Sequence, residues 1–239
     1  MAYTVREWLV DGSKYGLKCP YSMTPKFITI HNTSNSAPAV NEVSYMRSNS
    51  NATSFHVAID DKEAIIGIPF NRNAWHTGDG AGVNSGNRTS IGIEICYSTI
   101  GGDKYRQAED NAAHYTAQLL KKYGWGIDRV KQHWDFPRPK DGYRKNCPHR
   151  IRDEGRWGEF LAKVKLYLNG VQSTENKPVE NTEEELSLNE TGRNAIKSLL
   201  KKAAAKGEID KGVHTDAKIS GYSDRELISY AFAVINKKY

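Results

Sequence analysis

The residues in this 239-residue chain that are best suited to hold a metal ion are two histidines and a cysteine far apart in sequence, His31, His133 and Cys147. Imidazole and thiolate groups are usual zinc ligands, and three protein ligands with a fourth position left for water form the catalytic arrangement. Glu94 could serve as a general base, and Lys145 could act in catalysis or orient a ligand. The set therefore suggests hydrolysis at a zinc centre.

Each of these residues also has a simpler interpretation. A lone histidine in a strand is more often a hydrogen-bonded structural residue, and a free cysteine is usually a small buried apolar residue. Glu94 could be an exposed carboxylate on a solvated strand face, and His149 could complete a closed, structural zinc site. The basic neighbours of Cys147, among them Lys145 and Arg150, favour thiolate over thiol.

Strand patterns place both histidines where side chains from different strands can meet. Alternating, β-branched residues predict a strand over 26–33 that ends near His31, and another over 89–97 that carries Glu94 opposite a row of isoleucines. Residues 127–134 are expected to form a strand that closes on His133. Segments 54–61 and 63–70 are typical of a hairpin.

Helical spacing of apolar residues predicts three helices in the same part of the chain. They are expected around 40–46, over 104–123 with Gly124 at the end, and over 157–168. The glycine-rich segment 71–88 has little periodicity and is interpreted as a long functional loop. The pattern therefore predicts both strands and helices in this part of the chain, with one long irregular loop.

The C-terminal part has a different composition. Residues 170–187 are polar, acidic and poor in aliphatic residues, which marks a linker between a domain at 1–169 and a small domain at 188–239. In the small domain, helical spacing predicts one helix through Ile196 and Ala203. A capping box at 223–226 introduces another, through Leu227 and Val234.

Overall composition is that of a globular protein with 38% hydrophobic and 26% charged residues. A formal charge of +6 favours polyanionic partners, among which an anionic cell wall, nucleic acid and an acidic membrane face all qualify. Three cysteines make a disulfide framework improbable. No stretch approaches a membrane-spanning helix, and the N-terminus lacks the basic start and apolar run of a signal peptide, so we expect synthesis in a cytosol and no membrane insertion.

Five motifs in order resemble the zinc N-acetylmuramoyl-L-alanine amidase family, which includes phage endolysins, bacterial autolysins and peptidoglycan recognition proteins. The likeness covers roughly residues 20–168 and is greatest to endolysins of Bacillus phages and prophages. The motifs are ITIHNT at 28–33, FHVAIDD at 55–61, AWHTG at 74–78, SIGIE at 90–94 and KNCPHR at 145–150.

The resemblance implies a central mixed β-sheet flanked by helices, with Zn2+ held by His31, His133 and Cys147. It also implies cleavage of the amide between N-acetylmuramic acid and the L-alanine of the stem peptide, and hence bacterial lysis. By the same resemblance Glu94 is the base and Lys145 polarises the carbonyl or stabilises the oxyanion. Trp75 and His76 would line the substrate groove.

Some relatives carry a catalytic tyrosine where this chain has Phe55, which leaves the proton chemistry to Glu94.

The small C-terminal domain resembles lysin domains that bind cell-wall carbohydrate; a dimerisation or stabilising role is the alternative. For the whole chain, a non-catalytic peptidoglycan-binding protein on the same scaffold is the main rival, although the retained Cys147 favours the enzyme. We expect peptidoglycan as partner and not nucleic acid, since no nucleic-acid module is recognised. If the chain is a phage lysin, it would accumulate in the host cytoplasm and act on the wall after release.

Overall fold

The computed structural model divides into two compact units, residues 1–177 and 178–239, and each is described by itself. Of the linker expected at 170–187, residues 171–187 lie outside the described residues. The structure describes residues 3–170, 188–207, 209–210, 212, 214–224, 226–227, 230–231 and 234.

A six-stranded mixed sheet forms the centre of the first unit, in the order β1-β4-β3-β5-β2-β6. The pairs β3–β5, β5–β2 and β2–β6 are parallel, β1 is parallel to β4, and β3 and β4 form an antiparallel hairpin. The predicted mixed sheet flanked by helices is thus confirmed. The strands are β1 (Thr4–Glu7), β2 (Phe27–Asn32), β3 (Val57–Ile59), β4 (Glu63–Ile66), β5 (Ser90–Ile95) and β6 (Val130–Gln132).

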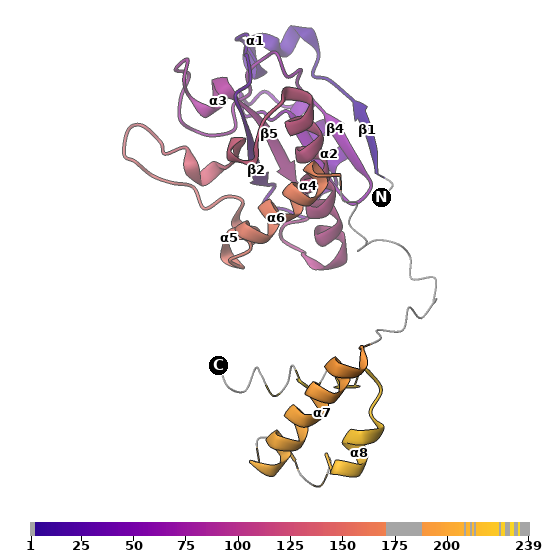
Figure 1. The fold of residues 1–239 in the computed structure, drawn as a ribbon. Coiled ribbons are helices and arrows are strands. Elements are labelled where there is room, and N and C mark those ends of the chain that lie inside the picture. Colours follow the sequence, from indigo (N-terminus) through magenta and orange to yellow (C-terminus); the bar gives the residue numbers. More distant parts are fainter. Residues whose placement is uncertain are drawn as a thin grey trace. The chain divides into compact units, whose positions relative to one another are not determined.

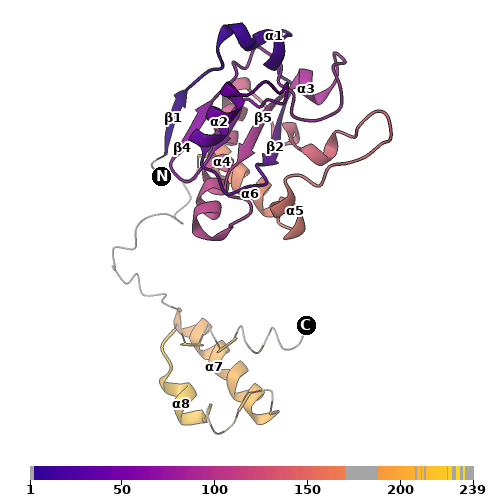
Figure 2. The same ribbon diagram turned by 180° about the vertical axis from the view of Figure 1, so that it is seen from behind.

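Helices cover both faces of this sheet, as the two opposite views show (Figures 1 and 2). Helices α4 (Gly102–Tyr123) and α6 (Trp157–Leu168) lie on one face, and α2 (Ala39–Ser48) lies on the other. Gly124 ends α4 in a left-handed conformation with φ of 65°, which its missing Cβ permits. Shorter helices are α1 (Tyr15–Lys18), α3 (Gly86–Thr89), α5 (His149–Asp153), and the 3-10 helices η1 (Gly12–Lys14), η2 (Ile127–Arg129) and η3 (His133–Asp135).

The neighbouring strands β2 and β5 carry much of the core of the first unit. Ile28 and Ile30 of β2, and Ile91, Ile93 and Ile95 of β5, are fully buried. Burial of side chains of this size contributes roughly 1.5–3 kcal/mol each. The rigid strand pair therefore fixes the positions of residues at its carboxyl ends.

The expected strand at 127–134 is shorter than its sequence pattern suggests. Residues 127–129 form η2, only Val130–Gln132 pair with β2, and His133 begins η3. The break has a local cause: the Asp135 carboxylate accepts a hydrogen bond from the Gln132 backbone at 2.8 Å and closes a capping box. His133 therefore leaves the sheet immediately after β6. Strand β1, at the sheet edge, was not predicted.

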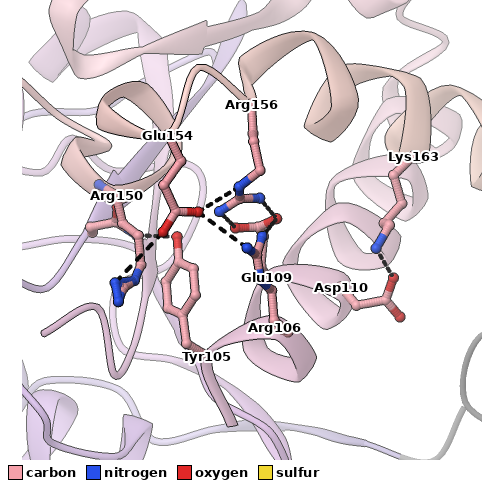
Figure 3. A network of polar contacts seen from close by, with 9 residues as sticks. Tyr105, Arg106, Glu109, Asp110, Arg150, Glu154, Arg156 and Lys163 are labelled. Atoms are coloured by element: carbon pink, nitrogen blue, oxygen red, sulfur yellow. Dashed lines mark hydrogen bonds and ion pairs between the residues drawn. The ribbon is translucent and has the colours of Figure 1, made fainter. Parts of the chain in front are cut away.

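An ion-pair network with a buried Arg156–Glu109 pair at its centre joins α4 to the start of α6 (Figure 3). The Arg156 guanidinium donates to both carboxylate oxygens of Glu109, at 2.5 and 3.0 Å, and its Nε donates to Glu154 at 2.6 Å. Nearby, Lys163 pairs with Asp110 at 3.1 Å. Paired charges of this kind hold two elements in one register, and loss of either partner leaves a costly buried charge.

The second unit has its own small core, formed by Leu200, Ala203, Ile219, Leu227 and Val234. Helix α7 (Glu190–Ala205) matches the predicted helix, and α8 (Asp216–Gly221) was not predicted. The predicted capping box is present: the Ser223 backbone donates to Glu226 at 2.9 Å, and the Glu226 backbone donates to the Ser223 hydroxyl at 3.4 Å. Much of the helix expected after it lies outside the described residues. Within the described part of the chain, no helix has the length and apolar character needed to cross a bilayer.

Candidate metal centre

Three parallel strands bring the predicted site residues to one edge of the sheet. His31 stands one residue before the end of β2, and its Cα register partner in the neighbouring β5 is Glu94. His133 follows β6, on the other side of β2. Ligand sites in open α/β sheets lie outside the carboxyl ends of such strands. The topology therefore positions three chemically active side chains together.

The three predicted ligands converge. His31 Nδ1 lies 3.1 Å from His133 Nδ1 and 3.7 Å from Cys147 Sγ, and the ligand atoms of all three residues lie within 4.8 Å of one another. All three residues are buried. In a tetrahedral zinc site two nitrogen ligands lie about 3.3 Å apart, and a nitrogen and a sulfur about 3.6 Å. The donor set and its spacing fit zinc.

Among the described residues, no fourth histidine, cysteine or carboxylate joins this group. His149, the alternative fourth ligand, begins α5 and hydrogen-bonds with the backbone of Ser98. An open position beside three ligands is the arrangement found in catalytic zinc sites, whereas structural sites are closed by a fourth residue.

The environment of the histidines keeps both imidazoles neutral. Burial lowers the pKa of His31 well below its usual value, and the nearby His133 and His76 act in the same direction. Burial also lowers the pKa of His133 to about 4, with Lys145 as the next cause. A neutral imidazole has the free lone pair that a metal requires.

Cys147 behaves differently from the sequence-based expectation of a thiolate. Burial raises the pKa of its thiol to about 12, with the Glu94 carboxylate as second cause. The Asn32 backbone N–H, 3.5 Å from Sγ, and the charges of Lys145 and Arg152 act in the opposite direction but are outweighed. A divalent cation bound beside the sulfur would supply the missing compensation and displace the proton.

Glu94 is the half-buried carboxyl group of the site. Its Oε2 atom is buried without a hydrogen-bond partner among the described residues. Burial raises the pKa of Glu94 to about 8; the charge of Lys145 opposes this rise and Glu42 adds to it. Lys145 itself is exposed on the loop before Cys147. The site therefore combines a desolvated carboxyl group with an exposed ammonium group, which Lys145 carries on a long, flexible side chain.

The two residues expected to line the substrate groove lie in different surroundings. Trp75 is half-buried, packs edge-to-face on Tyr21 with ring centroids 6.0 Å apart, and donates its Nε1–H to the Leu17 carbonyl. His76 is 8% exposed, and its Nδ1 lies 2.9 Å from Nε2 of His31. The structure thus places His76 in contact with His31, on the side of the His31 ring away from the other two predicted ligands.

Sequence reasoning missed Asn32, which links the cysteine loop to the sheet. Its side chain accepts a hydrogen bond from the Arg150 backbone at 3.0 Å and contacts the Tyr105 hydroxyl at 3.3 Å, while its backbone N–H points to Cys147. Its position directly after His31, at the end of β2, was the available signal.

Comparison with known proteins matches the chain to N-acetylmuramoyl-L-alanine amidases. Residues 21–150 match the family model described as N-acetylmuramoyl-L-alanine amidase. The N-acetylmuramoyl-L-alanine amidase XlyB of Bacillus subtilis is 52% identical over 185 residues, which cover 77% of this chain and 56% of XlyB. The chain therefore spans little more than half the length of that curated relative.

Solved structures agree with the sequence match. The structure of PlyL is 55% identical with a TM-score of 0.62, covering 67% of this chain and 96% of that chain. A mutant endolysin from Bacillus subtilis is 34% identical with a TM-score of 0.57, covering 69% of this chain and 99% of the other. Family match, identity and fold agree on the same part of the molecule. This chain belongs to the N-acetylmuramoyl-L-alanine amidase family.

Proposed function

We propose that this protein is a zinc-dependent peptidoglycan hydrolase that cleaves the amide between N-acetylmuramic acid and the L-alanine of the stem peptide. The observation that carries the proposal is the convergence of His31, His133 and Cys147 at one sheet edge, next to Glu94, whose Oε2 atom is buried. Family membership supports the bond and the substrate.

The three converging residues would hold the metal through His31 Nδ1, a ring nitrogen of His133 and the Cys147 sulfur. Bound zinc supplies Lewis-acid polarisation of the scissile carbonyl and lowers the pKa of a water molecule. Neutral imidazoles and an open coordination side suit this role.

Glu94 would move the proton. As a carboxylate it accepts a proton from the attacking water, and as the acid it returns that proton to the departing amine of L-alanine. A carboxyl with one buried oxygen free of hydrogen bonds can do both. Burial raises its pKa to about 8, which favours the return of the proton at neutral pH; the charge of a bound zinc ion would lower that pKa and favour the carboxylate that accepts the proton. The Lys145 ammonium donates a hydrogen bond to the carbonyl oxygen as negative charge develops there. Phe55 is buried and has no hydroxyl that could replace either group.

Outside the reaction centre, Trp75 is proposed to contact the substrate, since its ring is half-exposed beside Tyr21. The second unit is proposed to bind cell-wall carbohydrate. Lys202 of helix α7 and Lys206, directly after the helix, are exposed, which suits an anionic wall polymer. Similarity to an endolysin supports a lytic role on the bacterial wall, with release from a phage-infected cell as the setting.

Digestion of purified peptidoglycan, analysed by mass spectrometry with and without a chelator, tests this function. We expect free muramic acid lactyl carboxyls and new L-alanine amino termini, produced only when zinc is present. Products from another bond, or binding without any cleavage, would contradict the proposal. The second outcome would instead indicate a recognition protein on this scaffold.

The variant Glu94→Gln tests the assigned base in the same assay. It keeps the size of the side chain but cannot accept the proton, so cleavage should fall by at least about 10²–10⁴-fold. Zinc content should be unchanged, because Glu94 is not part of the converging group. Lysis at the wild-type rate would show that another group is the base.

A further inference from the structure

A chain of hydrogen-bonded ring nitrogens continues inward from the candidate metal centre. His31 Nε2 lies 2.9 Å from His76 Nδ1, and His76 Nε2 lies 3.3 Å from the carbonyl oxygen of Ser90. His31 is 1% exposed and His76 is 8% exposed. These contacts are therefore shielded from water.

Only one arrangement of protons satisfies this chain when His31 ligates through Nδ1. The Nε2 of His31 must then carry the hydrogen, which it donates to His76 Nδ1. His76 in turn carries its hydrogen on Nε2 and donates it to the Ser90 carbonyl, which can only accept. A backbone carbonyl thus fixes the tautomer of two successive imidazoles.

The same short segment also reaches the second ligand. His133 lies against the backbone of Thr77, the residue after His76. Asn87, which is 3% exposed, holds both residues in place: its carboxamide oxygen accepts from the His76 backbone at 2.7 Å and from the Thr77 backbone at 2.9 Å. Two adjacent loop residues therefore contact both histidine ligands.

Strand β5 leaves room for the His76 ring at Gly92. A Cβ atom at this position would lie 2.8 Å from the ring atoms of His76, closer than real Cβ contacts. Because Gly92 has no side chain, the buried strand β5 leaves space for the imidazole of His76 at this position. This is the second, independent sign that the position of the ring is specified by the fold.

Building on the zinc-dependent function proposed above, we propose that His76 is a positioning residue: its Nδ1 orients His31 and fixes its tautomer, and thereby raises the affinity of the site for zinc. Partners of this kind typically change metal affinity by about 10–100-fold. In this role His76 touches the ligand and not the substrate.

The test compares two variants at His76 by chelator competition for zinc. His76→Phe keeps a ring over Gly92 but removes both nitrogens, and it should weaken zinc binding by about 10–100-fold. His76→Asn places a carboxamide oxygen near the position of Nδ1 and should recover most of the affinity. The absorption spectrum of the cobalt-substituted protein should shift in the Phe variant and return toward wild type in the Asn variant.

A matched control is His56→Gln. His56 is fully buried, but its polar contacts are with backbone groups only: the Arg72 carbonyl at 2.9 Å and the Gly92 N–H at 3.0 Å. This variant should lower the melting temperature of the metal-free protein while zinc affinity stays within about twofold of wild type. If His56→Gln lost as much zinc affinity as His76→Phe, the effect of both variants would be explained by general destabilisation of the core, and the specific role of His76 would be contradicted.

A folded His76→Phe variant that binds zinc like wild type would overturn the inference. A raised KM with unchanged zinc affinity would do so as well, since it would assign His76 to substrate. If the variant does not fold, the imidazole 15N shifts of the zinc-loaded wild type decide the matter, because His76 must be the Nε2–H tautomer. A wild-type protein that does not bind zinc at all would instead refute the proposed function.

Discussion

The metal centre and the Arg156–Glu109 pair of the ion-pair network between α4 and α6 are both polar and buried, but they are balanced in opposite ways. In the network, Arg156 lies between the carboxylates of Glu109 and Glu154, so positive and negative groups pair (Figure 3). At the metal centre, neutral histidines, a thiol and the unpaired Oε2 of Glu94 are buried with no cation among them. The positive charges nearby are those of the exposed Lys145 and the half-buried Arg152.

This difference distinguishes buried polar groups that stabilise the fold from buried polar groups that bind a ligand. Buried charges that are fully paired hold elements together and have no remaining capacity to bind. Buried donors without a counter-charge are costly to the apo fold, and they are retained where a ligand supplies the balance. The metal centre can therefore be recognised because its buried polar groups lack a counter-charge, whereas in the ion-pair network each charged group has a partner.

Removal of zinc should have the largest effect on activity and stability, and this effect should arise at the metal centre and not in the ion-pair network. Dialysis against a strong chelator is expected to abolish peptidoglycan cleavage and lower the melting temperature, because zinc binds the folded state and not the unfolded chain. Re-addition of zinc should restore both. Calorimetry and the cleavage assay measure these effects. An unchanged melting temperature together with full activity would remove the proposed distinction between the two regions.

The sequence predicts best where local patterns decide the structure. Helix α4 ends at Gly124 as expected, and the β3–β4 hairpin forms where the pattern places it, although both strands are shorter. In the site, strand-end positions were enough to bring His31 and His133 together. These features depend on periodicity, turn residues and parallel strand topology.

The parts that could not be predicted depend on contacts distant in sequence. The expected functional loop at 71–88 has no periodicity, and its path is fixed by bonds such as those from Asn87 to the His76 and Thr77 backbones. Nothing local shows that His76 would turn inward onto His31. Likewise, the basic neighbours of Cys147 suggested a thiolate, but the burial that outweighs them is created only by the tertiary fold.

Disruption of the ion-pair network should reduce stability without affecting the metal. Arg156→Met leaves Glu109 buried without its partner and should destabilise the first unit by about 3–5 kcal/mol. The double variant Arg156→Met, Glu109→Gln should recover part of this loss, because it removes the uncompensated charge. Denaturant unfolding measures both variants. Zinc affinity by chelator competition should stay at the wild-type level, and a parallel loss of zinc would show that the two regions are coupled.

A smaller loss of stability is expected in acid, and we assign it to the buried histidines near the metal centre, which have no carboxylate partner, and not to the ion-pair network. Burial lowers the pKa of His56 to about 4, while an unfolded histidine titrates near 6.5. Below pH 6.5 the unfolded chain therefore binds the proton first, so His56 contributes stability above that pH and loses it as the pH falls toward 4. The loss reaches at most about 3 kcal/mol. Unfolding free energies of zinc-loaded wild type and His56→Gln, measured from pH 7.5 to 4.5, should show a shallower acid slope in the variant. Equal slopes would mean that His56 is not the source, and the carboxylates of the α4–α6 network would then be the groups to test.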